Sequence, residues 1–211
     1  MEFQIDMRVL ELVASRLCHD VVGPVGAVNN GMEMLEDEDF DMADEALGLV
    51  ADSARQAARS LQFYRMAYGM AGSRGGLGIS EIRELADGLL ANTKAKMDWD
   101  PNLTLEGAPD GLGKLLLNMI ALAEETLPRG GRLSLALAPQ GGGFAARVTA
   151  EGLGCALRPE SEIGLVDDVA IEDLTPRNVH GFFTRLVARR LGGDVTVEPG
   201  EGESIAVVAR L

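Results

Sequence analysis

His19 is the residue in this chain whose type and placement most favour chemistry. It is one of two histidines, with Asp20 next to it and Pro24 five residues further on. Read as a helix, the surrounding sequence carries an apolar stripe with alternating three- and four-residue spacing, typical of a helix bundle. The stripe consists of Leu10, Ala14, Leu17, Val21, Pro24 or Val25, Val28, Met32 and Leu35. On the helical wheel His19 lies nearly opposite this stripe, beside Arg16 and Asp20, so we expect it to face solvent.

A solvent-facing imidazole can do nucleophilic chemistry. Its neutral Nε2 can attack an electrophilic phosphorus and form a phosphohistidine. The attack is favoured when an acceptor holds the proton on Nδ1, and either Asp20 or a backbone carbonyl could serve. Gly23, Gly26 and Ala27 follow on or near the same side of the helix. Their small size leaves room for a partner's phosphoryl group to approach His19.

Other chemistries fit the sequence less well. Cys18 and His19 cannot form a thiolate dyad, because neighbouring side chains on a helix point about 100° apart. A metal site would need further ligands near His19 or His180, and neither has them at usable spacing. The acidic stretch 36–41 could bind a divalent cation weakly, but a solvated turn is the simpler interpretation. We expect His180, at the start of a predicted helix, to cap or pack rather than to react.

Composition narrows the class of protein. The chain has 211 residues and a formal net charge of −14, which argues against nucleic acid as a partner because phosphate contacts need clustered basic residues. No apolar run approaches a membrane span, and the first residues do not form a secretory signal. Cys18 and Cys155 lie in dissimilar contexts, which favours reduced thiols over a disulfide. We therefore expect a cytoplasmic protein that binds no membrane.

Hydrophobic periodicity divides the chain into two parts. Residues 1–72 predict a hairpin of two long helices, broken by a tight turn at 36–41. A hairpin alone buries too little apolar surface, so we expect a second copy to complete a dimeric four-helix bundle. The glycine-rich stretch 69–78 predicts a boundary, and residues 77–211 alternate helices and strands as in an α/β sandwich. The second part is predicted to contain helices at 80–92 (capped by Ser80), 109–127 and 179–191, and strands at 96–99, 103–105, 132–138, 144–150, 194–198 and 204–211.

Two segments of the first helix carry a resemblance to a known family. His19-Asp20-Val21-Val22-Gly23-Pro24 resembles the H-box of histidine kinases, in which an acid follows the histidine and a proline comes five residues later. The longer stretches 12–20 and 23–31 are similar to ChpT-type histidine phosphotransferases. The resemblance covers essentially the whole chain. It implies a dimerisation hairpin followed by a domain with the Bergerat-type ATPase fold of histidine kinases.

The chain departs from the kinases where they bind ATP. Aligned to the kinase motifs, Leu122 replaces the Asn that holds Mg²⁺, and Glu125 replaces a basic residue. Ala150 replaces the Asp that recognises adenine, and the lid before the last helix keeps a single glycine, Gly181. These losses remove the metal ligand and the free amides that cradle phosphates. We therefore expect a degenerate ATPase-like domain that binds no nucleotide and no metal.

The resemblance then implies a phosphorelay histidine phosphotransferase. His19 would accept a phosphoryl group from an aspartate on the receiver domain of a hybrid histidine kinase and pass it to a response regulator. The receiver would supply Mg²⁺, and Asp20 would orient the imidazole. We expect the receivers to dock on the surface around Arg16, Val22, Gly23, Gly26 and Ala27. Two alternatives remain at this point: an ATP-dependent sensor histidine kinase core, and a non-catalytic dimeric interaction module.

Overall fold

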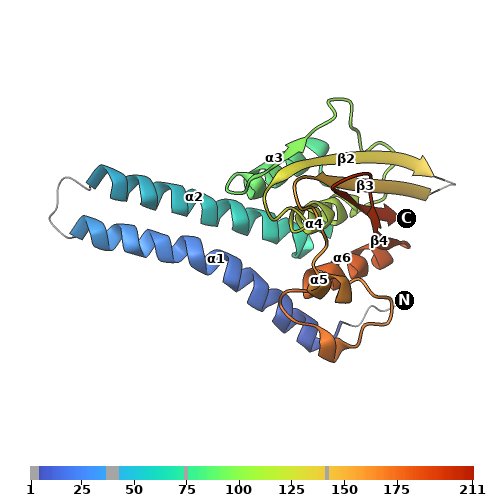
Figure 1. The fold of residues 1–211 in the computed structure, drawn as a ribbon, viewed down its shortest axis with the longest axis horizontal. Helices are drawn as coiled ribbons and strands as arrows, with labels where there is room; N and C mark the ends of the chain where they lie inside the picture. The colour runs from blue at the N-terminus through green and yellow to red at the C-terminus, as the bar shows by residue number, and fades with distance from the viewer. Residues whose placement is uncertain (1–4, 37–42, 74–75, 141–142) are drawn as a thin grey trace.

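The computed structural model describes residues 5–36, 43–73, 76–140 and 143–211. Its first part is an antiparallel hairpin of two helices, α1 (Met7–Glu36) and α2 (Ala43–Ala67), as the sequence predicted. The linked ends of the hairpin project away from the rest of the molecule (Figure 1). The predicted acidic turn at 36–41 lies, beyond Glu36, outside the described residues. The hairpin was predicted to extend to residue 72, but α2 ends at Ala67 and is followed by a 3₁₀ turn, η2 (Met70–Ser73).

The two helices approach closely at Gly31. A Cβ atom added there would lie 2.6 Å from Cγ2 of Val50 and 3.2 Å from the carbonyl oxygen of Ala46, so the contact requires glycine. The predicted apolar stripe is only partly buried within one chain, because Val25 and Met32 are 48% and 47% exposed. One neighbouring helix covers a narrower face of α1 than a four-helix bundle would. The rest of the stripe remains at the surface.

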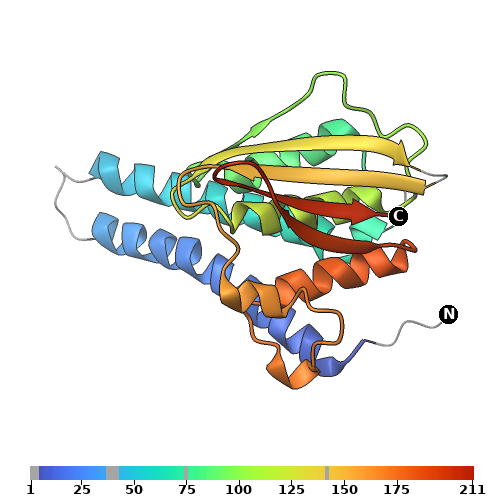
Figure 2. The ribbon, with the colours of Figure 1, turned by 45° about the vertical axis from the view of Figure 1, so that its right-hand side comes forward.

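The second part is an α/β sandwich, which confirms the predicted fold class. Its sheet has the order β1-β2-β3-β5-β4; β1 and β2 are parallel and the other neighbours antiparallel. Helices α3, α4 and α6 lie on one side of this sheet (Figures 1 and 2). The elements are α3 (Ile79–Leu90), β1 (Ala95–Asp98), α4 (Leu112–Glu124), β2 (Gly131–Gln140), β3 (Gly143–Glu151), α5 (Pro159–Ile163), η3 (Ile171–Asp173), α6 (Val179–Arg190), β4 (Asp194–Pro199) and β5 (Ser204–Arg210).

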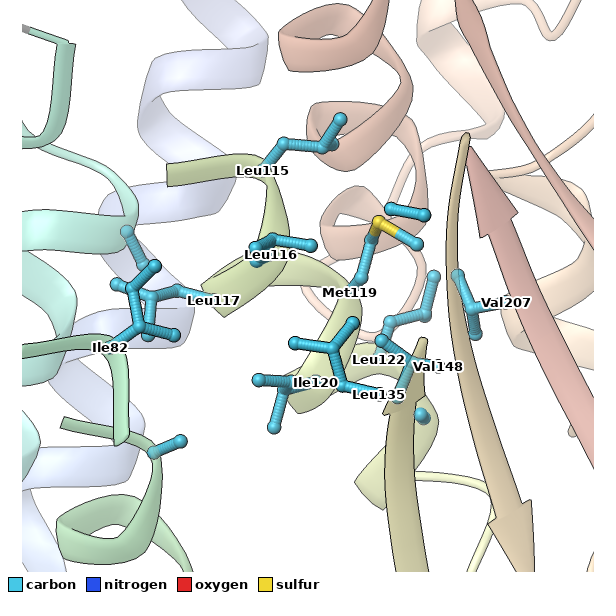
Figure 3. Close-up of a cluster of buried hydrophobic side chains, with 14 of the residues drawn as sticks. Ile82, Leu115, Leu116, Leu117, Met119, Ile120, Leu122, Leu135, Val148 and Val207 are labelled. Atoms are coloured by element: carbon cyan, nitrogen blue, oxygen red, sulfur yellow. The ribbon is translucent and has the colours of Figure 1, made fainter. Parts of the chain in front are cut away.

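Helix α4 is the centre of the core. Every residue from Leu112 to Ile120 is buried, so this helix is covered on all sides rather than along one stripe. Its apolar side chains face Leu135, Val148 and Val207 of the sheet, while Ile82 of α3 lies across from them (Figure 3). This surrounding core fixes the position of α4. Directly after this helix, Glu125 forms an ion pair with Arg16 of α1.

Two local predictions for the second part are wrong. α3 begins at Ile79 with Gly78 as its N-cap, and no side chain caps it, so Ser80 lies inside the first turn rather than at the cap. The predicted strand at 103–105 is absent, because Leu103 and Leu105 lie in a turn-rich segment and pack against the core individually. The short elements α5 and η3 were not predicted.

The hairpin and the sandwich share a hydrophobic core. Phe63, Tyr64, Met66 and Ala67 from the end of α2 belong to the same buried cluster as α4 and the sheet. A second, smaller cluster joins the first turn of α1 to the segment before α6 through Val9, Leu174 and Val179. The sandwich is thus packed against both helices of the hairpin. No helix among the described residues is long and apolar enough to cross a membrane.

Candidate functional site

His19 lies on the outer face of α1, as the helical wheel predicted. Its side chain is 89% exposed. Val22, one turn further along, is also exposed, and a Cβ atom added at Gly23 or Gly26 would meet nothing within 4 Å. Ala27 is half-buried. The surface beside the imidazole is therefore open enough to admit a folded partner.

A chain of hydrogen bonds leads from His19 into the protein. Nδ1 of His19 lies 3.3 Å from Oδ1 of Asp20, and Oδ2 of Asp20 accepts a hydrogen bond from the Tyr64 hydroxyl at 2.6 Å. Burial, together with the nearby Asp20 carboxylate, raises the pKa of Tyr64 above its ordinary value, so this hydroxyl stays protonated and donates. No role for Tyr64 was predicted from the sequence. Its contact with Asp20 spans 44 residues and left no local signal.

Arg16 does not lie on the open surface where it was predicted to contact a partner. Its side chain is only 19% exposed, and its guanidinium forms an ion pair with Glu125 at the end of α4. The reason is electrostatic. Burial alone would lower the pKa of Arg16, but the Glu125 carboxylate, together with Tyr68, Asp20 and Tyr64, more than offsets burial and keeps the guanidinium charged. Arg16 is therefore part of the contact between the hairpin and the sandwich.

Glu125 also binds His180, the second histidine. Nδ1 of His180 lies 2.7 Å from Oε1 of Glu125, and the imidazole is buried in the first turn of α6. Burial lowers the pKa of His180 below its ordinary value despite this carboxylate. Burial would raise the pKa of Glu125, but its contacts with His180 and Arg16 prevail and lower it. The cluster of Arg16, Glu125 and His180 thus joins α1, α4 and α6 around one ionised carboxylate.

The positions that bind ATP in kinases have other partners here. Leu122 and Ala150 are fully buried in the sandwich core. The carboxylate of Glu125 is occupied by Arg16 and His180. In the segment that corresponds to the lid, Oδ1 of Asn178 accepts a bond from the Thr175 amide at 2.8 Å, which closes the loop on itself. In the part of the chain that the structure describes, no three His, Cys, Asp or Glu side chains are grouped to hold a metal ion.

An exposed histidine on a helical hairpin, joined to a mixed α/β sandwich, is the arrangement expected from the resemblance to histidine phosphotransferases. Residues 79–203 match the family model of the histidine phosphotransferase C-terminal domain. The chain is 35% identical over 189 residues to the protein phosphotransferase ChpT of Brucella abortus (strain 2308), covering 88% of each chain. A solved structure of a bacterial phosphotransferase superposes with a TM-score of 0.82 at 28% identity, covering 99% of this chain and 98% of the other. This chain belongs to the histidine phosphotransferase family.

Proposed function

We propose that this chain is a phosphorelay histidine phosphotransferase of the cytoplasm. His19 takes a phosphoryl group from the phosphoaspartate of a hybrid kinase's receiver domain and passes it to the aspartate of a response regulator. The observation that carries this proposal is the 89% exposure of His19 on the H-box helix of a chain in this family. Such exposure is required of a nucleophile whose donor and acceptor both belong to other proteins.

The transfer is a substitution at phosphorus. Nε2 of His19 attacks the phosphorus of the acyl phosphate, the P–O bond to the receiver's carboxyl group breaks, and that group leaves as a carboxylate. Nδ1 keeps its proton, so the imidazole ring gains positive charge as the N–P bond forms. The Asp20 carboxylate faces Nδ1 at 3.3 Å and stabilises this charge. Transfer to the response regulator is the same step in reverse. Mg²⁺ held by the receiver neutralises charge on the phosphoryl oxygens.

We further propose that His19 is not phosphorylated from ATP by this chain. Buried apolar side chains stand at Leu122 and Ala150, where a kinase has its metal ligand and its adenine-binding acid. Repulsion by Glu125 is not the reason, since the Arg16 guanidinium compensates its charge. The residues present do not fit a magnesium nucleotide, because Leu122 offers no metal ligand and the Glu125 carboxylate is already bound by Arg16 and His180.

The working unit in this proposal is a homodimer. Exposed residues recur at intervals of seven along both helices of the hairpin, which is the spacing of a coiled-coil seam. The stripe, called here the open seam, consists of Cys18, Val25 and Met32 on α1 and Leu47, Ala54 and Leu61 on α2. A second copy that covers the open seam completes a four-helix bundle and leaves His19 outside. The receivers would then dock over Val22, Gly23, Gly26 and Ala27.

A labelling experiment tests the source of the phosphoryl group. The purified chain is incubated with ³²P-ATP and Mg²⁺, and separately with receiver domains of the same organism that have been charged at their aspartate with ³²P-acetyl phosphate. We expect label from a charged receiver and none from ATP. His19→Ala should abolish the label, whereas Asn29→Ala, an exposed change on the same helix, should keep it. Label acquired from ATP alone would establish a kinase, and no label from any charged receiver would favour a non-catalytic module.

A further inference from the structure

We infer that Tyr64 is a positioning residue that orients the phosphoacceptor imidazole of His19 through Asp20. This inference rests on the proposed function, and it assigns a role in the transfer to a residue on α2, the helix that does not carry the histidine. The three side chains form a continuous path, in which the Tyr64 hydroxyl donates to Oδ2 of Asp20 at 2.6 Å and Oδ1 of Asp20 lies 3.3 Å from Nδ1 of His19.

The path becomes more rigid toward the interior. An exposed imidazole on a helix can rotate, and the Asp20 side chain is itself only partly covered. Tyr64 is buried, and its ring makes two aromatic contacts. It stacks on Tyr68 with ring centres 5.3 Å apart and meets the edge of Phe63 at 5.7 Å. The Tyr64 hydroxyl is therefore a fixed point from which the Asp20 carboxylate can be held in one orientation.

The two carboxylate oxygens of Asp20 have different partners, and this decides which nitrogen of His19 reacts. With Oδ2 bound by Tyr64, Oδ1 remains to accept a hydrogen bond from the N–H group of the imidazole. An ionised carboxylate only accepts hydrogen bonds, so it selects the tautomer that carries its proton on Nδ1. The lone pair then lies on Nε2, the nitrogen on the far side of the ring from Asp20. A positioned acid plays the same part beside the catalytic histidine of serine proteases.

The test uses two matched tyrosine variants. Tyr64→Phe keeps the ring and its stacking and removes only the hydroxyl that binds Asp20. Tyr68→Phe makes the same chemical change one turn later, at a hydroxyl that lies outside this path. Two quantities are measured in the full-length chain: the rate of phosphoryl transfer from a charged receiver, and the tautomer of His19 from the ¹⁵N shifts of its imidazole.

We expect Tyr64→Phe to slow transfer about 10-fold or more, by analogy with the hydrogen-bond partners that orient metal-ligating histidines, whose loss typically costs that much. Receiver affinity should be unchanged, and the population of the Nδ1–H tautomer should fall. Tyr68→Phe should leave both the rate and the tautomer within twofold of the parent. A wild-type rate in Tyr64→Phe, an unaltered tautomer, or an equal effect of both variants would overturn the inference. If the parent chain takes no phosphoryl group, the proposed function fails, and the tautomer measurement still decides the role of Tyr64.

Discussion

The two histidines show how environment separates residues of one type. His19 is almost fully exposed and contacts a carboxylate that is anchored from inside the protein, whereas the His180 side chain is 1% exposed and bound to Glu125. Burial lowers the pKa of His180 and so favours its neutral form, and a phosphoryl group on another protein has no access to it. The interpretation of His180 as a packing residue agrees with this arrangement. In our proposal the reactive histidine is therefore His19, which the fold leaves exposed.

The role of the Asp20 charge in the proposed transfer can be tested directly. Asp20→Asn preserves the shape of the side chain but removes the negative charge that faces the developing imidazolium. We expect transfer from a charged receiver to slow by about 10²-fold or more, in the range typical of a positioned acid or base. Rapid-quench kinetics measure the rate, and circular dichroism checks that the fold is intact. A variant that transfers at the parent rate would show that Asp20 has no part in the reaction.

The sequence predicted the exposure of some site residues but not the contacts of others. The exposure of His19 followed from the helical period alone, because a residue opposite an apolar stripe faces away from whatever the stripe covers. The partners of Arg16 and Asp20 did not follow. Arg16 meets Glu125 across 109 residues, and Asp20 meets Tyr64 across 44. Such contacts depend on how α1 packs against α4 and α2, which no local pattern encodes.

The distance between the two helices of the hairpin depends on Gly31. A methyl group at this position would overlap Val50 and press on the backbone of α2. We expect Gly31→Ala to lower the free energy of unfolding by about 1–3 kcal/mol relative to Gly26→Ala, because overpacking costs that much. Both changes gain the same helix propensity, and Gly26 has nothing within 4 Å of the added atom, so their difference isolates the packing. Urea titration measures it, and equal stabilities would refute the close approach.

Arg185 of α6 joins this helix to the sheet. Its buried guanidinium binds both carboxylate oxygens of Asp194 at 2.9 and 2.6 Å, and also bonds to the Leu165 carbonyl at 2.9 Å. The hydrogen bond from Arg185, supported by the Val195 amide and the charge of Arg189, lowers the pKa of Asp194 to about 2.

A pKa that folding depresses contributes stability above the unfolded value, and this contribution is lost as the pH falls through the folded value. We therefore expect Asp194→Asn to lower the melting temperature at pH 7, and the deficit to shrink as the pH falls from about 4 toward 2. Melting curves across this range test the ion pair. A deficit that is constant with pH would assign the effect to packing instead.

The elements that the sequence predicted well are those with long, regular patterns. The two hairpin helices, α4, α6 and the paired strands of the sheet all follow from apolar periodicity and turn residues. α5 and η3 are too short to show a period. The Ser80 prediction failed because a serine near a helix start indicates a cap only when it directly precedes the first turn, and here the helix begins one residue before it. Leu103 and Leu105 alternate like a strand but bury their side chains from a loop.

The whole molecule is a hairpin whose two helices both contact the sandwich. α2 contributes to the main core, and α1 contributes through Val9 and through the cluster of Arg16, Glu125 and His180. This arrangement places the sandwich beside the helix that carries His19 (Figures 1 and 2). The sandwich therefore serves as a fixed support for the histidine-bearing helix, in keeping with our proposal that the chain binds no nucleotide.

If the open seam is the dimer interface, a charge placed in it should halve the mass of the particle in solution. Met32→Glu places a charge in the open seam, far along α1 from His19, and should convert the proposed homodimer to a monomer of 22.4 kDa. Leu153→Glu is the matched control, because Leu153 is equally apolar and exposed but lies on the sandwich. Light scattering after size exclusion measures both. A parent chain that is already monomeric, or a Met32→Glu variant that stays dimeric, would refute the open seam as the dimer interface.

In our proposal His19 carries the phosphoryl group from one partner protein to another, and ³¹P NMR can follow the group on this residue. The chain is charged by a phosphorylated receiver, separated from that donor in the absence of ATP, and observed by ³¹P NMR before and after addition of an uncharged response regulator. We predict one phosphoramidate signal, at Nε2 of His19, that is absent in His19→Ala and disappears as the regulator's aspartate becomes phosphorylated. A signal that persists in His19→Ala, or one that forms from ATP without any receiver, would contradict the account.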